Sequence, residues 1–155
     1  MASIQESIDV QVPLSTAYNQ WTQFEQFPQF MEAVKSVRQL DDTHLRWVAE
    51  AGGQEHEWTA EITEQRPDER VAWKATEGHG NSGVVTFHRL GEAETRITVQ
   101  MEHETEGMVE ALGSALGADS RRVQGDLERF KDLIEGRGAE SGAWRGEVER
   151  GRQIR

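Results

Sequence analysis

The chain has 155 residues, enough for one domain that buries roughly 68–70% of its unfolded surface. It carries 28 acidic against 17 basic residues, and the resulting net charge of −11 disfavours nucleic acid or an anionic membrane surface as a partner. Because cysteine is absent, disulfides, thiolate metal sites and thiol nucleophiles are excluded.

The chain shows no sign of membrane insertion or export. No apolar run approaches the roughly 20 residues that span a bilayer. The N-terminus also lacks the basic and apolar regions of a secretory signal. We therefore expect a cytoplasmic protein without integral membrane association.

The first thirty residues predict a strand followed by two short helices. Apolar and polar side chains alternate between residues 3 and 12, which is typical of a half-buried strand that ends at Pro13. The next stretch has an apolar helical spacing of i, i+4 and i+7 at Ala17, Trp21 and Phe24. In the run Phe24–Met31, four large apolar side chains surround Pro28, which permits only a new helical turn to begin. We expect this run to lie as an apolar wedge against a larger surface.

Between Val34 and about His103 the apolar period shortens from 3.6 to 2, and turn signals divide the stretch into six strands of a meander. One face of each strand is apolar and the other is mostly polar, as in an antiparallel sheet with one covered face. The apolar face comprises Leu45, Trp47, Ala49, Trp58, Ala60, Ile62, Val71, Trp73, Ala75, Val85, Phe87, Ile97, Val99 and Met101.

A heptad-like apolar stripe between Met108 and Glu135 predicts one long helix that covers this sheet. The stripe comprises Val109, Leu112, Leu116, Val123, Leu127, Phe130 and Ile134. Gly113 and Gly117 each weaken the helix by up to roughly 1 kcal/mol relative to alanine, so we expect a bend or an unwound turn in its first half.

Residues 136–155 differ in composition from the domain that spans residues 1–135. They are rich in glycine, arginine and glutamate with almost no apolar periodicity, which predicts a flexible tail. The tail has a net charge of +2 and the domain one of −13, so the tail is attracted weakly to its own domain. Trp144, the one aromatic residue of the tail, is expected to be unanchored.

Six segments carry a family resemblance: Ala17–Met31, Glu57–Ile62, Pro67–Trp73, Gly83–Phe87, Thr95–Val99 and Asp126–Lys131. They resemble the polyketide cyclase/dehydrase branch of the START-like (Bet v 1-like, SRPBCC) superfamily, which includes the ubiquinone-binding START proteins. The resemblance covers nearly all of residues 3–135. It implies an α+β helix-grip fold, in which a curved antiparallel sheet of about seven strands wraps around the long C-terminal helix and leaves a hydrophobic cavity.

The resemblance implies binding or carriage of a hydrophobic small molecule, such as a lipid, a quinone or a polyketide, without a cofactor. The residues expected to contact it are Trp21, Phe27, Phe30, Trp47, Trp58, Trp73, Phe87, Met101, Leu112 and Leu116. Two alternatives remain open. One is a polyketide aromatase/cyclase, and the other is a protein-interaction module that uses the sheet edge, the helix face or the tail.

Four polar residues are candidates for cyclase chemistry. His56 precedes Trp58 on the ligand-facing parity and His103 closes the last strand, and histidine can act as a general acid or base near neutral pH. Tyr18 could donate a hydrogen bond into the cavity, and Arg89 points inward by strict alternation. Each also has a plainer interpretation as a surface or packing residue, so the residues do not decide whether the protein is an enzyme.

Nucleotide and metal sites are not expected. The segment Gly78–Gly83 has GxGxxG spacing, but strand patterns lie on both sides, so it is interpreted as a hairpin loop. The five histidines never pair at i, i+4 on a predicted helix, which argues against a metal site.

Overall fold

The computed structural model of the protein describes residues 2–51, 53–77, 82–103 and 120–154. The elements of these residues follow the predicted order of a strand, two short helices, a six-stranded meander and a C-terminal helix. They are β1 (Ala2–Val10), α1 (Leu14–Trp21), the 3-10 helix η1 (Phe24–Gln29), β2 (Val34–Asp41), β3 (His44–Ala51), β4 (Gln54–Arg66), β5 (Arg70–Glu77), β6 (Ser82–Gly91), β7 (Glu94–His103), α3 (Ser120–Arg137), β8 (Val148–Glu149) and β9 (Arg152–Gln153).

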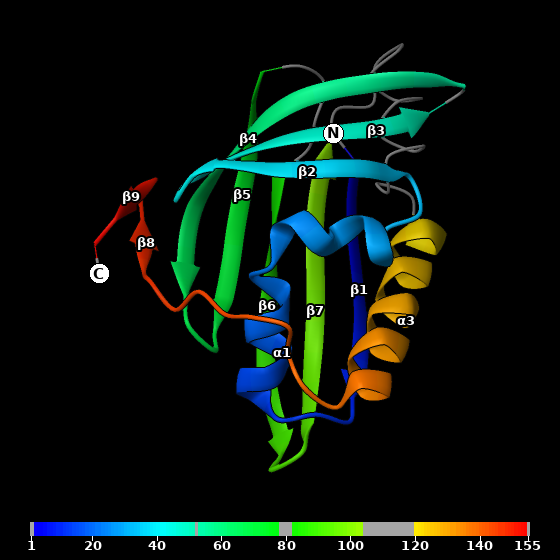
Figure 1. Cartoon of the computed structure of the whole chain (residues 1–155), viewed down its shortest axis with the longest axis vertical. Coiled ribbons are helices and arrows are strands. Elements are labelled where there is room, and N and C mark those ends of the chain that lie inside the picture. Colours follow the sequence, from blue (N-terminus) through cyan, green and yellow to red (C-terminus); the bar gives the residue numbers. More distant parts are fainter. Residues whose placement is uncertain (1, 52, 78–81, 104–119, 155) are drawn as a thin grey trace.

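All strand pairs of the sheet are antiparallel, and the order of the long strands is β1-β7-β6-β5-β4-β3-β2. The N-terminal strand lies beside the last strand of the meander, with Ala2 opposite His103 and Val10 opposite Thr95. In Figure 1 the helices lie on one face of this sheet. The arrangement confirms the α+β helix-grip fold, with β8 and β9 as additional short strands.

The sheet bends strongly because β4 is irregular. The register of β4 against β5 shifts between Thr59 and Ala60, and again between Ile62 and Glu64. Such β-bulges bend a strand and increase its twist. Figure 1 shows the result, since β2, β3 and the first part of β4 cross above the other strands. The space enclosed by this bend holds the aromatic core.

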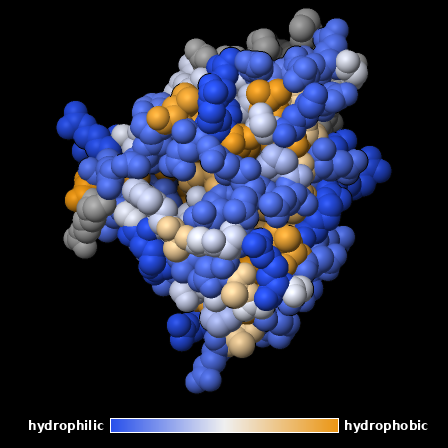
Figure 2. Space-filling model, in the orientation of Figure 1, coloured by the Kyte–Doolittle hydropathy of each residue, from blue (hydrophilic) through white to orange (hydrophobic). Residues whose placement is uncertain are grey.

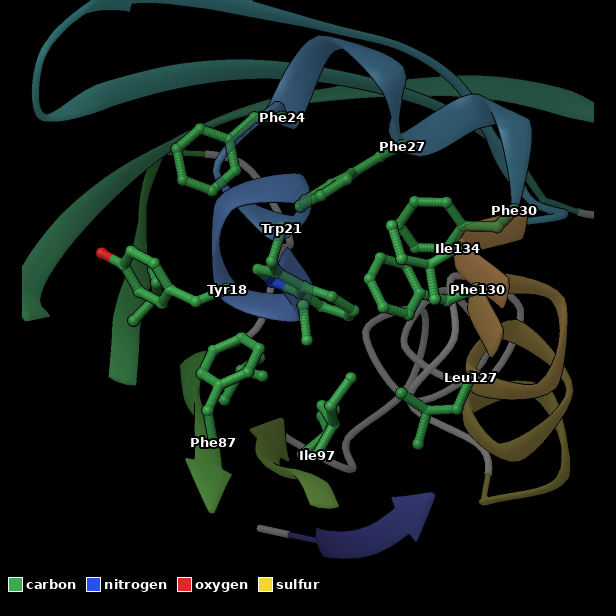
Figure 3. Close-up of a cluster of buried hydrophobic side chains, with 14 of the residues drawn as sticks. Tyr18, Trp21, Phe24, Phe27, Phe30, Phe87, Ile97, Leu127, Phe130 and Ile134 are labelled. Atoms are coloured by element: carbon green, nitrogen blue, oxygen red, sulfur yellow. The ribbon is translucent and has the colours of Figure 1, made fainter. Parts of the chain in front are cut away.

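Aromatic residues of α1 and η1 occupy much of that space. Trp21 lies at the centre of the cluster in Figure 3, and its ring centroid is 5.0 Å from that of Phe130 and 5.5 Å from that of Phe27. The run Phe24–Met31 therefore forms the apolar wedge expected from the sequence. The outer surface seen in Figure 2 is mainly hydrophilic, with small separate hydrophobic areas.

Helix α3 packs beside β1 through the apolar stripe predicted for this part of the chain. Its buried residues are Val123, Leu127, Phe130 and Ile134. On its polar side, Lys131 Nζ donates a hydrogen bond of 3.0 Å to the Asp9 carbonyl, and Glu135 accepts one of 2.7 Å from the Gln11 amide. The first half of the predicted long helix, with Gly113 and Gly117, lies outside the described residues.

The C-terminal segment 138–154, here called the strap, is not the flexible tail that its composition predicted. It runs from the end of α3 across α1 to the β8–β9 hairpin (Figure 1). Ser141 N donates a hydrogen bond of 2.8 Å to Gln20 Oε1, and Trp144 N donates one of 3.1 Å to Thr22 Oγ1. Trp144 is therefore anchored, and its side chain packs against the core.

The strap ends by covering an edge of β4. Since β3 starts opposite Glu61, the last residues of β4 extend beyond β3. There β8 pairs with β4, with Val148 opposite Gln65, and Val148 is fully buried. Exposed strand edges invite pairing with other chains, so this hairpin protects the sheet. Composition alone missed the contact because it is made by backbone groups and one short apolar side chain.

Candidate functional site

A cavity of about 100 Å³, measured as the space open to the centre of a water molecule, lies between the bent sheet, η1 and α3. This is well above the roughly 10–15 Å³ that admits one water. Many of its described lining residues are aromatic: Trp21, Phe24, Phe27, Trp47, Trp58 and Trp73. The cavity therefore offers ring faces and edges to a guest.

Strand pairing positions two of these rings. Trp47 of β3 and Trp58 of β4 are directly opposite in the register, and their indoles stack with centroids 5.7 Å apart and planes at 8°. The Trp47 Nε1 group is buried without a hydrogen-bond partner among the described residues. The stack forms one wall of the cavity.

A glycine makes room for a third ring. Gly83 of β6 lies opposite Trp73 of β5, and a Cβ atom at Gly83 would approach the Trp73 ring to 3.0 Å. It would also clash with the Gln100 carbonyl oxygen. Only glycine fits at this position without a shift of the backbone or of the Trp73 side chain.

Asp126 of α3 is the one charged side chain among the described lining residues. Its Oδ1 accepts a hydrogen bond of 3.2 Å from the Glu32 amide and another from Arg129 Nη2. Burial raises the pKa of Asp126, while the hydrogen bonds from Arg129 and Glu32 and the positive charge nearby oppose that rise. This carboxyl group joins α3 to the η1–β2 connection, where Met31 and Ala33 also line the cavity.

The structure separates the predicted ligand-contact residues into groups. Those that line the cavity are Trp21, Phe27, Trp47, Trp58, Trp73 and Met101. Phe30 and Phe87 belong to the packed core instead: Phe30 contacts Phe130 at a centroid distance of 5.1 Å, and Phe87 contacts Tyr18 at 5.4 Å. Leu112 and Leu116 lie outside the described residues.

The catalytic candidates whose side chains are described do not gather around the cavity. Arg89 is exposed at the end of β6, where it pairs with Thr95, and the register shifts between Arg89 and Gly91. The irregular strand end releases the Arg89 side chain to solvent, which corrects the expected inward orientation. Because His103 ends β7, Arg89 and His103 lie about 26 Å apart along the sheet at roughly 3.3 Å per residue.

The histidine candidate whose side chain is described lies off the cavity. His56, near the start of β4, is half-buried, and it pairs with Ala49 rather than lining the cavity. The side chain of His103 lies outside the described residues. His56 and Arg89 therefore do not come together at the cavity as an acid–base pair.

Tyr18 is fully buried, but its hydroxyl does not face the cavity. Figure 3 shows the hydroxyl directed away from the other labelled side chains. Burial raises the pKa of Tyr18 to about 12, although nearby Gln65 and Arg145 lower it somewhat. The Tyr18 hydroxyl and both polar atoms of the Gln65 side chain are buried without a hydrogen bond of normal geometry to any described residue. Tyr18 thus belongs to the contact between α1, β4 and the strap.

Sequence reasoning missed Asp126 as a site residue. A signal was present, because Asp126 follows Val123 by three residues and precedes Phe130 by four, which places it on the buried face of α3. An acidic residue inside an apolar stripe is unusual enough to indicate a specific role. The apolar members of the stripe alone predict the helix, so Asp126 does not enter that prediction.

The described residues contain no group of three or more histidine, aspartate or glutamate side chains that could hold a metal ion. None of the helices in the described ranges combines the length and the apolar character needed to cross a membrane.

Comparisons with known proteins agree with this architecture. Residues 10–132 match the family described as "Polyketide cyclase / dehydrase and lipid transport". An uncharacterized 17.2 kDa protein of Streptomyces lincolnensis is 52% identical over 149 residues, which cover 96% of this chain and 99% of that protein.

Solved structures show the same fold. A Deinococcus radiodurans protein is 26% identical, with a TM-score of 0.69, and the match covers 87% of this chain and 98% of that one. The Zhui aromatase/cyclase from Streptomyces sp. R1128 is 14% identical, with a TM-score of 0.72, over 92% of this chain and 99% of that one. At the latter identity the likeness concerns the fold alone.

Proposed function

Because the chain belongs to the polyketide cyclase/dehydrase and lipid transport family, we propose that its cavity binds and carries a hydrophobic small molecule of the lipid, quinone or polyketide type. The observation that carries this proposal is the unfilled space of about 100 Å³ with an almost wholly apolar described lining. Protein interiors are close-packed, and they contain few voids larger than a water molecule. An apolar space of this size therefore favours a guest molecule.

The lining favours a guest that contains rings. Aromatic pairs in offset or edge-to-face geometry contribute about 0.5–1.5 kcal/mol beyond the area that they bury. The Trp47–Trp58 stack and the rings of Trp21 and Phe27 offer such contacts from several directions. A quinone or a polyketide-like ring system uses these walls better than a straight acyl chain.

We propose binding rather than cyclisation because of where the polar groups lie. A cyclase needs an acid or base within hydrogen-bond reach of the reacting carbon chain. Among the catalytic candidates whose side chains are described, the Tyr18 hydroxyl points away from the cavity rings, Arg89 is exposed, and His56 is off the cavity. The one carboxylate in the described lining, Asp126, is held by a hydrogen bond from Arg129. We expect no turnover of a poly-β-ketone mimic, as measured by chromatography of the products.

The test uses tryptophan fluorescence. Four of the five tryptophans line the cavity, so a bound quinone should quench their emission. We expect saturable quenching by 1,4-naphthoquinone, with heat of binding in a calorimetric titration. Val99→Phe, which places a ring into the cavity, should weaken binding by at least about tenfold, which corresponds to about 1.4 kcal/mol.

The matched control is Val84→Phe. Val84 is half-buried and neighbours the cavity residue Val85 on β6, so alternation turns it to the opposite face of the sheet. The affinity of the Val84→Phe variant for 1,4-naphthoquinone should stay close to that of the unsubstituted protein. Equal affinities of the two folded variants, or no saturable binding of naphthoquinone, a fatty acid or a poly-β-ketone mimic, would contradict the proposal.

A further inference from the structure

We propose that Asp126 makes the cavity selective for ring compounds that carry a hydroxyl group over the same rings without one. The inference rests on the proposed function and adds the polar group that the guest presents. It starts from the position of one carboxylate in an otherwise apolar lining.

The two oxygens of Asp126 are used unequally. Both of its hydrogen bonds from described residues, those from the Glu32 amide and from Arg129, end on Oδ1. Among these residues Oδ2 has no donor, and the side chain is only 15% exposed. Because little of this side chain reaches solvent, a guest that supplies an O–H group to Oδ2 binds with an added gain.

Neighbouring charges favour a neutral donor over a cation. Arg129 already forms ion pairs with Asp126 and, across 3.6 Å, with Glu32. A positively charged guest would meet the Arg129 guanidinium beside the carboxylate, and an anionic guest would meet the carboxylate itself. A hydroxyl avoids both repulsions, and its hydrogen bond to an ionised oxygen is of the stronger, charge-assisted kind.

The selectivity arises because a guest ring without a hydroxyl group provides no hydrogen bond to the Asp126 carboxylate. A ring without a hydroxyl fills the same aromatic walls and covers Asp126 Oδ2, but it supplies no donor to that oxygen. Sites built around a polar group discriminate strongly against analogues that lack the matching group. Burial also raises the pKa of Asp126, which is the direction expected for a carboxylate that water solvates poorly.

The experiment compares 2-naphthol with naphthalene at neutral pH, where both are uncharged. An apolar pocket alone prefers naphthalene, which is the more hydrophobic probe. We expect the protein to bind 2-naphthol at least about tenfold more tightly. Asp126→Leu should abolish or reverse this preference. The matched control Asp132→Leu, at an exposed position of α3, should retain it.

The possible outcomes are distinct. If the protein binds both probes equally, or if the preference survives in Asp126→Leu, the inference is wrong while the proposed binding function stands. If neither probe nor any ligand of the panel binds, the proposed function itself fails. Should Asp126→Leu not fold, the Asp126→Asn variant is measured instead, because its neutral acceptor forms a weaker hydrogen bond than the carboxylate. The preference for 2-naphthol should then fall at least about threefold, which is roughly the charge-assisted share of the bond. An unchanged preference in Asp126→Asn overturns the inference.

Discussion

Arg145 of the strap donates two hydrogen bonds to Asp68, from Nη1 to Oδ1 over 3.0 Å and from Nη2 to Oδ2 over 2.8 Å. The same guanidinium lies 5.7 Å from the centroid of the Tyr18 ring, and it donates a hydrogen bond of 2.6 Å to Asn19 Oδ1. One arginine thus joins α1 to the β4–β5 turn. The strap is therefore part of the folded domain and stabilises its helix-to-sheet packing.

The first prediction concerns the pair Arg145 and Asp68. Both side chains are partly exposed, so their coupling should be modest, about 0.5–1 kcal/mol in a double-mutant cycle. Arg145→Met and Asp68→Asn are suitable, because Asp68 has a φ of 63° that asparagine tolerates. Urea denaturation of the four proteins gives the coupling, which should shrink in high salt. A coupling of zero at low salt would contradict the contact.

The second prediction tests whether the strap is docked. Val148 is 0% exposed, so Val148→Ala should lower the free energy of unfolding by about 2 kcal/mol through lost burial and a residual cavity. Ile154→Ala, at a position that is 47% exposed, should change it by less than about 0.5 kcal/mol. If urea denaturation shows equal effects of the two substitutions, the strap is not docked and the flexible tail expected from composition is the better description.

The third prediction concerns alkaline pH. The pKa of Tyr18 is about 12 in the folded protein, above its ordinary value of 10.0, because burial disfavours the phenolate. Between these pH values the unfolded chain has lost the proton and the folded protein still holds it, so stability falls as pH rises. The loss should reach roughly 2–3 kcal/mol once pH exceeds the folded pKa.

The measurement for Tyr18 is direct because the chain has one tyrosine. Near-ultraviolet absorbance of the phenolate during a pH titration should show ionisation well above the value of a free tyrosine. At high pH the free energy of unfolding should fall less in Tyr18→Phe, because that variant has no phenol to ionise. Ionisation at the ordinary pKa in the folded protein would show that the hydroxyl reaches water.

The fourth prediction compares two glycines. Gly83→Ala should destabilise the protein by about 1–3 kcal/mol, since its Cβ meets the Gln100 backbone oxygen and the Trp73 ring. Gly136→Ala in α3 meets nothing within 4 Å, and it should stabilise the helix by roughly 0.5–1 kcal/mol. Thermal unfolding should shift in opposite directions, and a neutral Gly83→Ala would argue against the close approach of β6 and β7.

Much of the fold follows from local patterns. Strand alternation correctly assigns Leu45, Trp58 and Ile62 to the buried face, and the helical stripe correctly assigns Leu127 and Ile134. Such patterns can be predicted from the sequence because the direction of a side chain depends on its own helix or strand. The cavity lining is harder to predict, because Phe30 and Phe87 have the same chemistry as the cavity rings but pack in the core.

The sequence by itself determined which elements form and which face of each is apolar, because periodicities of 2 and 3.6 are properties of single segments. Only the tertiary structure decided that the Tyr18 hydroxyl turns away from the cavity rings, that Val148 covers the edge of β4, and that Asp126 reaches the cavity. These depend on the bulges that bend β4 and on contacts between residues distant in sequence. Such relationships arise when elements pack together, and no single segment encodes them.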